Sequence, residues 1–172
     1  MSPRKGAQRP VGDSNGRETG QGMGKPVRRR SGPLARLRPL TWAEARCEAT
    51  PDGWHFALPT PERTNAIWRQ WQGKTLVSKR HRLDKQLAPA RFGAFEPMRG
   101  EVAVRLVWVR HRRVGDVDSR VKAALDLLTA IGVWVDDGQV VDLHVIRSDE
   151  PTRAPGLYVW VWPADAPRVE AA

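Results

Sequence analysis

Three aspartates have the spacing that metal-assisted chemistry on a phosphate requires. Asp116 and Asp118 lie two residues apart at the start of a predicted helix, and Asp137 follows that helix. In an extended stretch, residues i and i+2 point the same way, so both of the first two carboxylates can face one point. We expect the segment after the helix to bring Asp137 back beside them. Mg²⁺, or Mn²⁺ in its place, would relieve the repulsion among three such carboxylates and clamp a phosphate.

Each acid alone also has an ordinary structural explanation. Asp118 could cap the helix that follows, and Asp116 could favour the positive end of that helix. The sequence Asp-Asp-Gly at 136–138 is typical of a hairpin turn. The three acids together, beside the basic loop Arg-His-Arg-Arg at 110–113, favour the metal site.

Lys122 lies one turn into the same predicted helix, away from its apolar stripe. A lysine at this position could meet a phosphate held at the start of the helix, which makes Lys122 a fourth candidate catalytic residue. The alternative is a solvated lysine paired with Asp126 four residues later, a contact worth about a few tenths of a kcal/mol.

The apolar pattern predicts the elements that must position these residues. Period-two alternation predicts strands at 54–58, 101–109, 140–146 and 157–162, with a shorter extended piece at 75–77. An apolar stripe followed by Gly132 predicts a helix over 119–130, and weaker signals predict helices at 79–87 and, behind a capping box, at 41–48. Strands and helices mixed in this way predict an α/β (α+β) two-layer sandwich with a mixed β-sheet.

The N-terminal segment has a different composition from the rest of the chain. Residues 1–40 hold ten Lys or Arg against Asp13 and Glu18, seven glycines, five prolines and no aromatic residue. Such a segment cannot bury enough surface to offset its ordering entropy. We therefore predict a disordered basic arm at 1–40, one folded domain at 41–163 and a short tail at 164–172.

Charge and composition also restrict the partners. The net charge is +10, and the excess favours a polyanion such as nucleic acid. The single Cys47 permits no internal disulfide, and no apolar stretch is long enough to span a membrane. These features predict a cytoplasmic, nucleoid-associated protein without a membrane partner.

Two groups of motifs resemble one known family. The segment Gly-Asp-Val-Asp-Ser-Arg-Val-Lys at 115–122, then Asp126, then Val-Trp-Val-Asp-Asp-Gly-Gln-Val-Val-Asp at 133–142, is similar to the signature of the RusA-type Holliday junction resolvases, the crossover junction endodeoxyribonucleases. Upstream, Leu-Pro-Thr-Pro-Glu-Arg-Thr-Asn-Ala-Ile-Trp-Arg at 58–69 and Gly-Lys-Thr-Leu-Val-Ser-Lys at 73–79 look like two further family motifs. The resemblance covers about residues 54–162.

The resemblance implies a homodimeric, Mg²⁺-dependent endonuclease that nicks opposite strands of a four-way DNA junction symmetrically in recombination and repair. It implies metal binding by Asp116, Asp118 and Asp137, and a phosphate or transition-state role for Lys122. Ser119 stands where the family usually has Asn, inside the active-site motif, and Glu-Arg at 62–63 replaces a Pro-Ser pair. The departure at Ser119 bears on rate or substrate preference.

Basic and aromatic residues around these motifs are the candidate contacts to DNA. Trp68 and Trp71 could stack on unpaired bases, although core packing is the commoner use of tryptophan. Two alternatives stay open: a general metal-dependent nuclease acting on flaps and other branches, and a non-catalytic protein that binds branched DNA. The residues we predict to contact DNA are Asn65, Trp68, Arg69, Lys74, Lys79, Arg110, Arg112 and Arg113.

Overall fold

The computed structural model of the chain describes residues 37–111 and 115–166. Its main feature is a five-stranded sheet in the order β1-β2-β7-β5-β6, accompanied by a separate two-stranded sheet, β3-β4. The strands are β1 Arg46–Thr50, β2 Gly53–Leu58, β3 Trp68–Trp71, β4 Lys74–Val77, β5 Val102–Val109, β6 Val140–Ser148 and β7 Gly156–Pro163. The helices are α1 Thr64–Ile67, α2 Lys79–Phe92, α3 Val121–Ile131 and the 3-10 turn η1 Asp137–Gln139.

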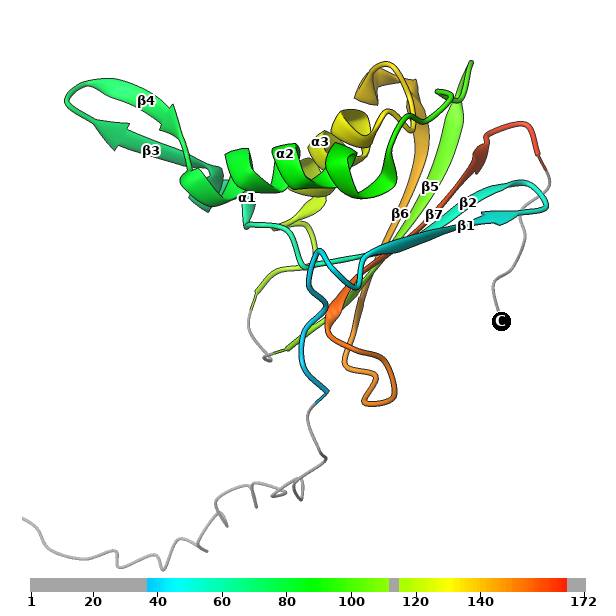
Figure 1. Cartoon of the computed structure of the whole chain (residues 1–172), viewed down its shortest axis with the longest axis horizontal. Coiled ribbons are helices and arrows are strands. Elements are labelled where there is room, and N and C mark those ends of the chain that lie inside the picture. The colour runs from blue at the N-terminus through cyan, green and yellow to red at the C-terminus, as the bar shows by residue number, and fades with distance from the viewer. Residues whose placement is uncertain (1–36, 112–114, 167–172) are drawn as a thin grey trace, which may run out of the picture. The chain divides into compact units, whose positions relative to one another are not determined.

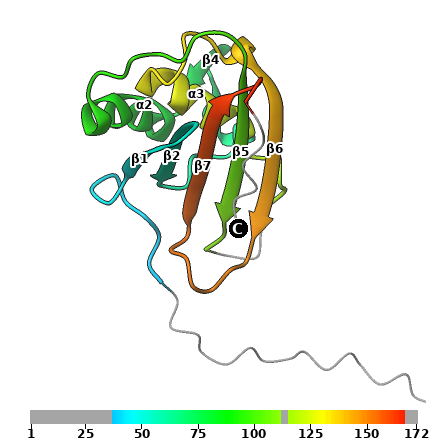
Figure 2. The same cartoon turned by 90° about the vertical axis from the view of Figure 1, so that its right-hand side faces the viewer.

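The large sheet is mixed, as predicted. β5 and β6 are parallel because α3 crosses between them, whereas β1-β2, β2-β7 and β7-β5 are antiparallel. Helices α2 and α3 lie on one side of the sheet (Figure 1), and β7, β5 and β6 run side by side when the molecule is turned (Figure 2). The predicted two-layer α/β architecture is therefore confirmed.

The core lies between the sheet and the two long helices. Alternate residues of β5 point into it: Val104, Leu106 and Trp108 are at most 4% exposed. α3 contributes Leu128, and Trp134 beyond it is also fully buried. Burying side chains of this size at roughly 1.5–3 kcal/mol each gives the sheet and helices a common hydrophobic core.

Helix α3 matches its prediction closely. It begins at Val121, two residues later than predicted, and ends at Gly132, whose φ of 88° is the left-handed conformation that favours glycine at a helix C-terminus. Ala123 and Leu127 are buried in addition to the predicted stripe. The buried face is wider than predicted because α2 packs against α3 beside the sheet.

The predicted helix at 41–48 is wrong. Thr41 does donate from its backbone nitrogen and its hydroxyl to Glu44 Oε2, at 3.0 and 2.8 Å, but the contact closes only a turn. The chain then enters β1, where Cys47 lies opposite Phe56 of β2. Pairing with a distant strand outweighs the local capping signal in this segment.

The second sheet is a hairpin that contacts little else. β3 and β4 pair with each other through a two-residue connection, Gln72-Gly73, in which both residues have positive φ, 47° and 73°. This is the turn geometry that matches the twist of a tight hairpin. The hairpin extends away from the five-stranded sheet (Figure 1). The extended piece at 75–77 was predicted, but β3 was not.

The predicted arm falls almost entirely outside the described residues, as do residues 167–172 of the predicted tail. Within the described part, Leu40 N donates to Pro155 O at 2.8 Å, and its side chain packs against the face of the sheet that the helices leave uncovered. Ala164 N donates to Glu101 O at 3.0 Å. None of the helices in the ranges 37–111 and 115–166 is long and apolar enough to cross a membrane.

Candidate active site and nucleic-acid interface

Asp116 and Asp118 lie in the loop that leaves β5 and opens α3. Two contacts fix this loop: Arg147 Nη1 donates to Gly115 O at 2.9 Å, and Thr64 N donates to Ser119 O at 2.7 Å. Gly115 has a φ of 110°, and a Cβ there would lie 2.9 Å from Cη2 of Trp108. The loop is therefore held against the C-terminal ends of β5 and β6.

The carboxylates themselves are left available. Residues 117–120 form turns, so the prediction that this stretch is extended is wrong. The backbone makes the local contacts: Asp116 O accepts from Ser119 N and Oγ, and Asp118 O accepts from Val121 N. α3 has no side-chain cap. Both aspartates are exposed, and their carboxylates have no hydrogen bond or ion pair with any residue that the structure describes.

Asp137 lies at the other end of the sheet. The strand register places Val102 opposite Val140 and Val109 opposite Ser148, and Asp137 comes just before Val140. Helix α3 lies between Asp118 and Asp137 in the chain, and its eleven residues span about 16 Å. The neighbouring Asp136 caps η1 by accepting from Gly138 N at 2.7 Å. The side chain of Asp137 is exposed.

The three predicted metal ligands therefore do not meet within one chain. Among residues 37–111 and 115–166, no group of three or more His, Cys, Asp or Glu side chains lies close enough to hold a metal ion. The expected return of the chain after Gly132 does not occur, because β6 begins beside the start of β5. Asp116 and Asp118 share one end of the fold, and Asp137 occupies the opposite end.

Lys122 lies at the same end as Asp116 and Asp118. Its Nζ is 3.4 Å from Oδ1 of Asp126, the i+4 pair considered from the sequence. The other oxygen of Asp126 is 3.6 Å from Nε2 of His81, a buried histidine of α2. Lys122, Asp126 and His81 line an open hollow of about 400 Å³, together with Trp68 at its rim.

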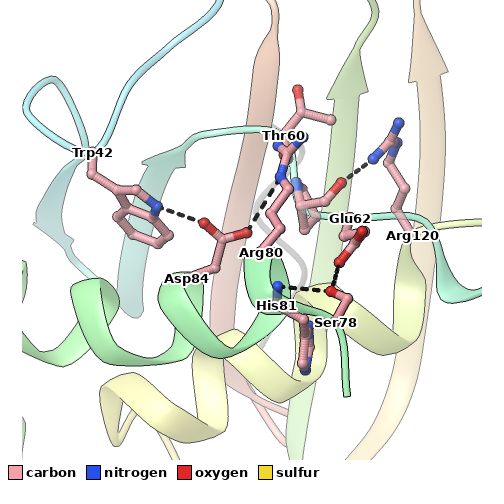
Figure 3. A network of polar contacts seen from close by, with 9 residues as sticks. Trp42, Thr60, Glu62, Ser78, Arg80, His81, Asp84 and Arg120 are labelled. Carbon is pink, nitrogen blue, oxygen red and sulfur yellow. Dashed lines mark hydrogen bonds and ion pairs between the residues drawn. The ribbon is translucent and has the colours of Figure 1, made fainter. Parts of the chain in front are cut away.

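Arg120 joins this end of the fold to the segment before α1. Its guanidinium donates to Pro61 O (Figure 3). The same group lies 4.7 Å from the centroid of the Trp108 ring. Burial, with Arg63 and Arg80 nearby, lowers the pKa of Arg120 to about 10, and Glu62 opposes that shift. Three guanidinium groups thus lie close together around Arg120, with Glu62 opposing their charge there and Asp84 pairing with Arg80 at 3.7 Å.

A second set of contacts ties the same segment to α2 (Figure 3). The Ser78 hydroxyl donates to Glu62, and His81 N donates to Ser78 Oγ at 3.0 Å, which caps α2. Arg80 reaches Thr60 O at 2.8 Å. In the sequence, residues 62–63 stand out only as a departure from the family pattern. Nothing local indicated that Glu62 would meet Ser78, sixteen residues later.

The predicted DNA contacts fall into three groups. The side chain of Arg110 is 9% exposed and forms a bidentate ion pair with Asp149. This contact favours a structural role for Arg110 over the predicted contact to DNA. Arg112 and Arg113 lie outside the described residues. The remaining five are exposed and follow one another through α1, the β3–β4 hairpin and the first turn of α2: Asn65, Trp68, Arg69, Lys74 and Lys79.

The order and spacing of these residues match a known family across most of the fold. The model of Endodeoxyribonuclease RusA matches residues 59–161. The chain belongs to the RusA family. It is 32% identical over 98 residues to the crossover junction endodeoxyribonuclease of Enterobacteria phage 82, covering 55% of this chain and 82% of that protein. It is 31% identical over 99 residues to the corresponding proteins of Escherichia coli (strain K12) and Shigella sonnei (strain Ss046), covering 54% of this chain and 80% of each.

The RusA match includes the whole candidate site. It begins at Pro59, next to the segment that Arg120 holds, and it contains Asp116, Asp118, Lys122 and Asp137. Strands β1 and β2 precede it. The resemblance found in the sequence is thereby confirmed at the level of the family.

Proposed function

We propose that this chain is an endodeoxyribonuclease that resolves four-way DNA junctions. The observation that carries the proposal is that the carboxylates of Asp116 and Asp118 are exposed and have no partner among the described residues. Both lie just before the helix that carries Lys122, inside the segment that matches the RusA family. The relatives named above are crossover junction endodeoxyribonucleases. Paired, symmetric nicks and a role in recombination or repair belong to this proposal.

The proposal includes Mg²⁺ dependence. Exposed aspartates without protein partners are the hard oxygen ligands that Mg²⁺ prefers. Asp116 and Asp118 would hold the ion, which when bound supplies Lewis-acid stabilisation of the scissile phosphate and an activated water. Lys122 would face the same phosphate, where its ammonium can stabilise negative charge that develops during cleavage.

A homodimer would bring Asp137 into this site. β6 is an edge strand of the described sheet, with Val141 52% and Leu143 38% exposed, whereas β7 is paired on both of its edges. An exposed edge of this kind can pair with another chain. If two β6 strands pair antiparallel about a two-fold axis, the Asp137 end of one copy lies beside the Asp116 end of the other. The symmetry also supplies two equivalent sites for two opposed cuts.

Basic residues would guide DNA to the site. Helix α1 contacts the loop that carries Asp116 and Asp118, because Thr64 N donates to Ser119 O at 2.7 Å. Asn65, Trp68, Arg69, Lys74 and Lys79 are exposed on α1 and the segment that follows it. Arg82 and Lys85 line the hollow around Lys122. Phosphate contacts of this type supply most of the affinity for DNA and make it depend on salt.

The test compares labelled four-way junction, flap and linear duplex, each with and without Mg²⁺. We expect Mg²⁺-dependent cleavage of the junction at opposed positions and little cleavage of duplex. Preferential cleavage of flaps would favour the general nuclease instead. Tight junction binding by the wild-type chain with no cleavage under any divalent ion would favour the non-catalytic DNA-binding alternative.

A further inference from the structure

The β3–β4 hairpin exposes large apolar side chains that lie outside the hydrophobic core of the monomer. Trp71 is 64% exposed, Trp68 49% and Leu76 46%. Every residue of β3 is exposed, and apart from β4 the strand has substantial contacts only with the short α1. An isolated two-stranded hairpin is marginally stable in water, so these side chains add no core of their own. Exposed apolar side chains that lie together on a surface are candidates for a binding site.

The strand register divides the hairpin into two faces. Directly paired residues share a face, and Gln70 Nε2 donates to Thr75 Oγ1 at 2.9 Å across one such pair. The opposite face carries two pairs, Arg69 with Leu76 and Trp71 with Lys74. An indole and a leucine side chain therefore lie side by side, with a cation at each end.

This face borders a hollow of about 340 Å³. The hollow lies between the hairpin and the first turn of α2, and its walls include Trp71, Leu76, Lys79 and Arg82. Most of its lining is apolar, and its charged groups are all cations. The hollow thus combines one aromatic side chain, Trp71, with three cations, Arg69, Lys79 and Arg82.

The charge of the segment identifies the kind of occupant. Residues 68–83 contain five Lys or Arg and no Asp or Glu. If the apolar surface of the hairpin docked against a protein or a second copy of this chain, these cations would lie at the interface. The hairpin itself offers no acidic residue to pair with them. A nucleobase joined to phosphates fits both properties, because its ring stacks on the indole while its phosphates meet the cations.

We propose that the hollow beside Trp71 receives an unstacked base from the branch point of the DNA, with the Trp71 indole as the stacking surface and Arg69 and Lys74 as contacts to the flanking phosphates. The inference rests on the proposed function, since it supplies the selectivity for branched DNA. Bases at a branch are cheaper to unstack than those within a duplex arm. Trp71 is thus a specificity-determining residue that takes no part in the cleavage chemistry.

The experiment measures binding of the full chain in EDTA, so that cleavage does not interfere. Trp71→Leu keeps an apolar side chain and removes the aromatic surface, and Trp71→Phe keeps the aromatic surface. We expect Trp71→Leu to weaken junction binding by roughly 5- to 100-fold, with duplex binding changed less than twofold. Trp71→Phe should retain most of the preference for junctions. Lys85→Ala is the matched control, because Lys85 lines the separate hollow around Lys122 and its loss should weaken junction and duplex binding alike.

A junction with abasic nucleotides at the branch point completes a double-mutant cycle. If Trp71 stacks on a branch-point base, wild type and Trp71→Leu should bind the abasic junction with equal affinity. Additive losses would overturn the inference. A shift of Trp71→Leu from dimer to monomer in sedimentation would also overturn it, and would assign the hairpin to contact between copies. Cleavage of the junction by the wild-type chain is measured separately, with Mg²⁺. Neither binding result therefore decides whether the chain has the proposed nuclease activity.

Discussion

Lys122 and Asp126 face each other across one turn of α3, with Nζ 3.4 Å from Oδ1. The second carboxylate oxygen of Asp126 lies 3.6 Å from Nε2 of His81, whose side chain is only 6% exposed. One oxygen of the Asp126 carboxylate therefore contacts a buried histidine, and the other contacts the half-exposed ammonium of Lys122. This arrangement restrains Lys122 near the end of α3 where Asp116 and Asp118 lie.

Lys122→Ala should lower kcat for junction cleavage by roughly 10²–10³, the usual effect of losing one group that stabilises transition-state charge. Thermal unfolding should change little, because an exposed i+4 pair is worth about 0.3–0.5 kcal/mol. Lys85→Ala, in the same hollow, is the control and should weaken DNA binding with kcat unchanged. A fall in kcat of less than threefold for Lys122→Ala would assign this lysine to the solvated surface.

Mixing two inactive variants tests whether the site spans two chains. Asp116→Asn and Asp137→Asn should each abolish cleavage alone. In a mixed dimer built as proposed, one site carries both substitutions and the other carries neither, so single-strand nicking should return to about half of the dimers after subunit exchange. If each chain builds its own site, the mixture stays inactive. Sedimentation of each variant provides the control that both still dimerise.

Glu62→Gln should destabilise the fold by about 1–3 kcal/mol, because it removes a charged acceptor of the Ser78 hydroxyl and the carboxylate that counters the effect of Arg63 and Arg80 on Arg120. Urea unfolding measures the change. Glu96→Gln removes the same charge from an exposed position and should have almost no effect. Equal stability of the two variants would mean that Glu62 does not balance the guanidinium groups.

Gly115→Ala tests the close contact beside Asp116. The substitution combines a φ of 110° with a Cβ only 2.9 Å from the Trp108 ring, so we expect a loss of roughly 1–3 kcal/mol and slower cleavage. Gly93→Ala is the matched control: its φ is also positive, 73°, but a Cβ there meets nothing within 4 Å. Equal losses for both variants would show that only the backbone conformation matters.

Local pattern predicted the elements that carry the most buried apolar residues. The strand at 101–109 and the helix ending at Gly132 have a clear apolar period, and both lie within two residues of their predicted limits. β3 was missed because it buries neither face, so its sequence carries no alternation. β1 was missed because its pairing partner, β2, outweighs the capping signal of Thr41.

The candidate site was predicted as a set of residues but not as an arrangement. The types and spacing of Asp116, Asp118 and Lys122 identified one end of the fold. The position of Asp137 depends on where β6 begins relative to β5, which is a property of sheet topology and not of local sequence. The pairing of Arg110 with Asp149 likewise joins residues 39 apart, so the basic loop could not be divided into structural and DNA-facing residues beforehand.

The crossover helix α3 has a further consequence if the proposed dimer forms. Each copy of α3 would then connect the two active sites, with Asp118 before it serving one and Asp137 beyond it serving the other. The helix would act as a fixed spacer between the two points of cleavage. Adding or removing a turn would displace ligands in both sites at once, so variation in length within this fold should collect in the loop after β5 and in the β3–β4 hairpin rather than in α3.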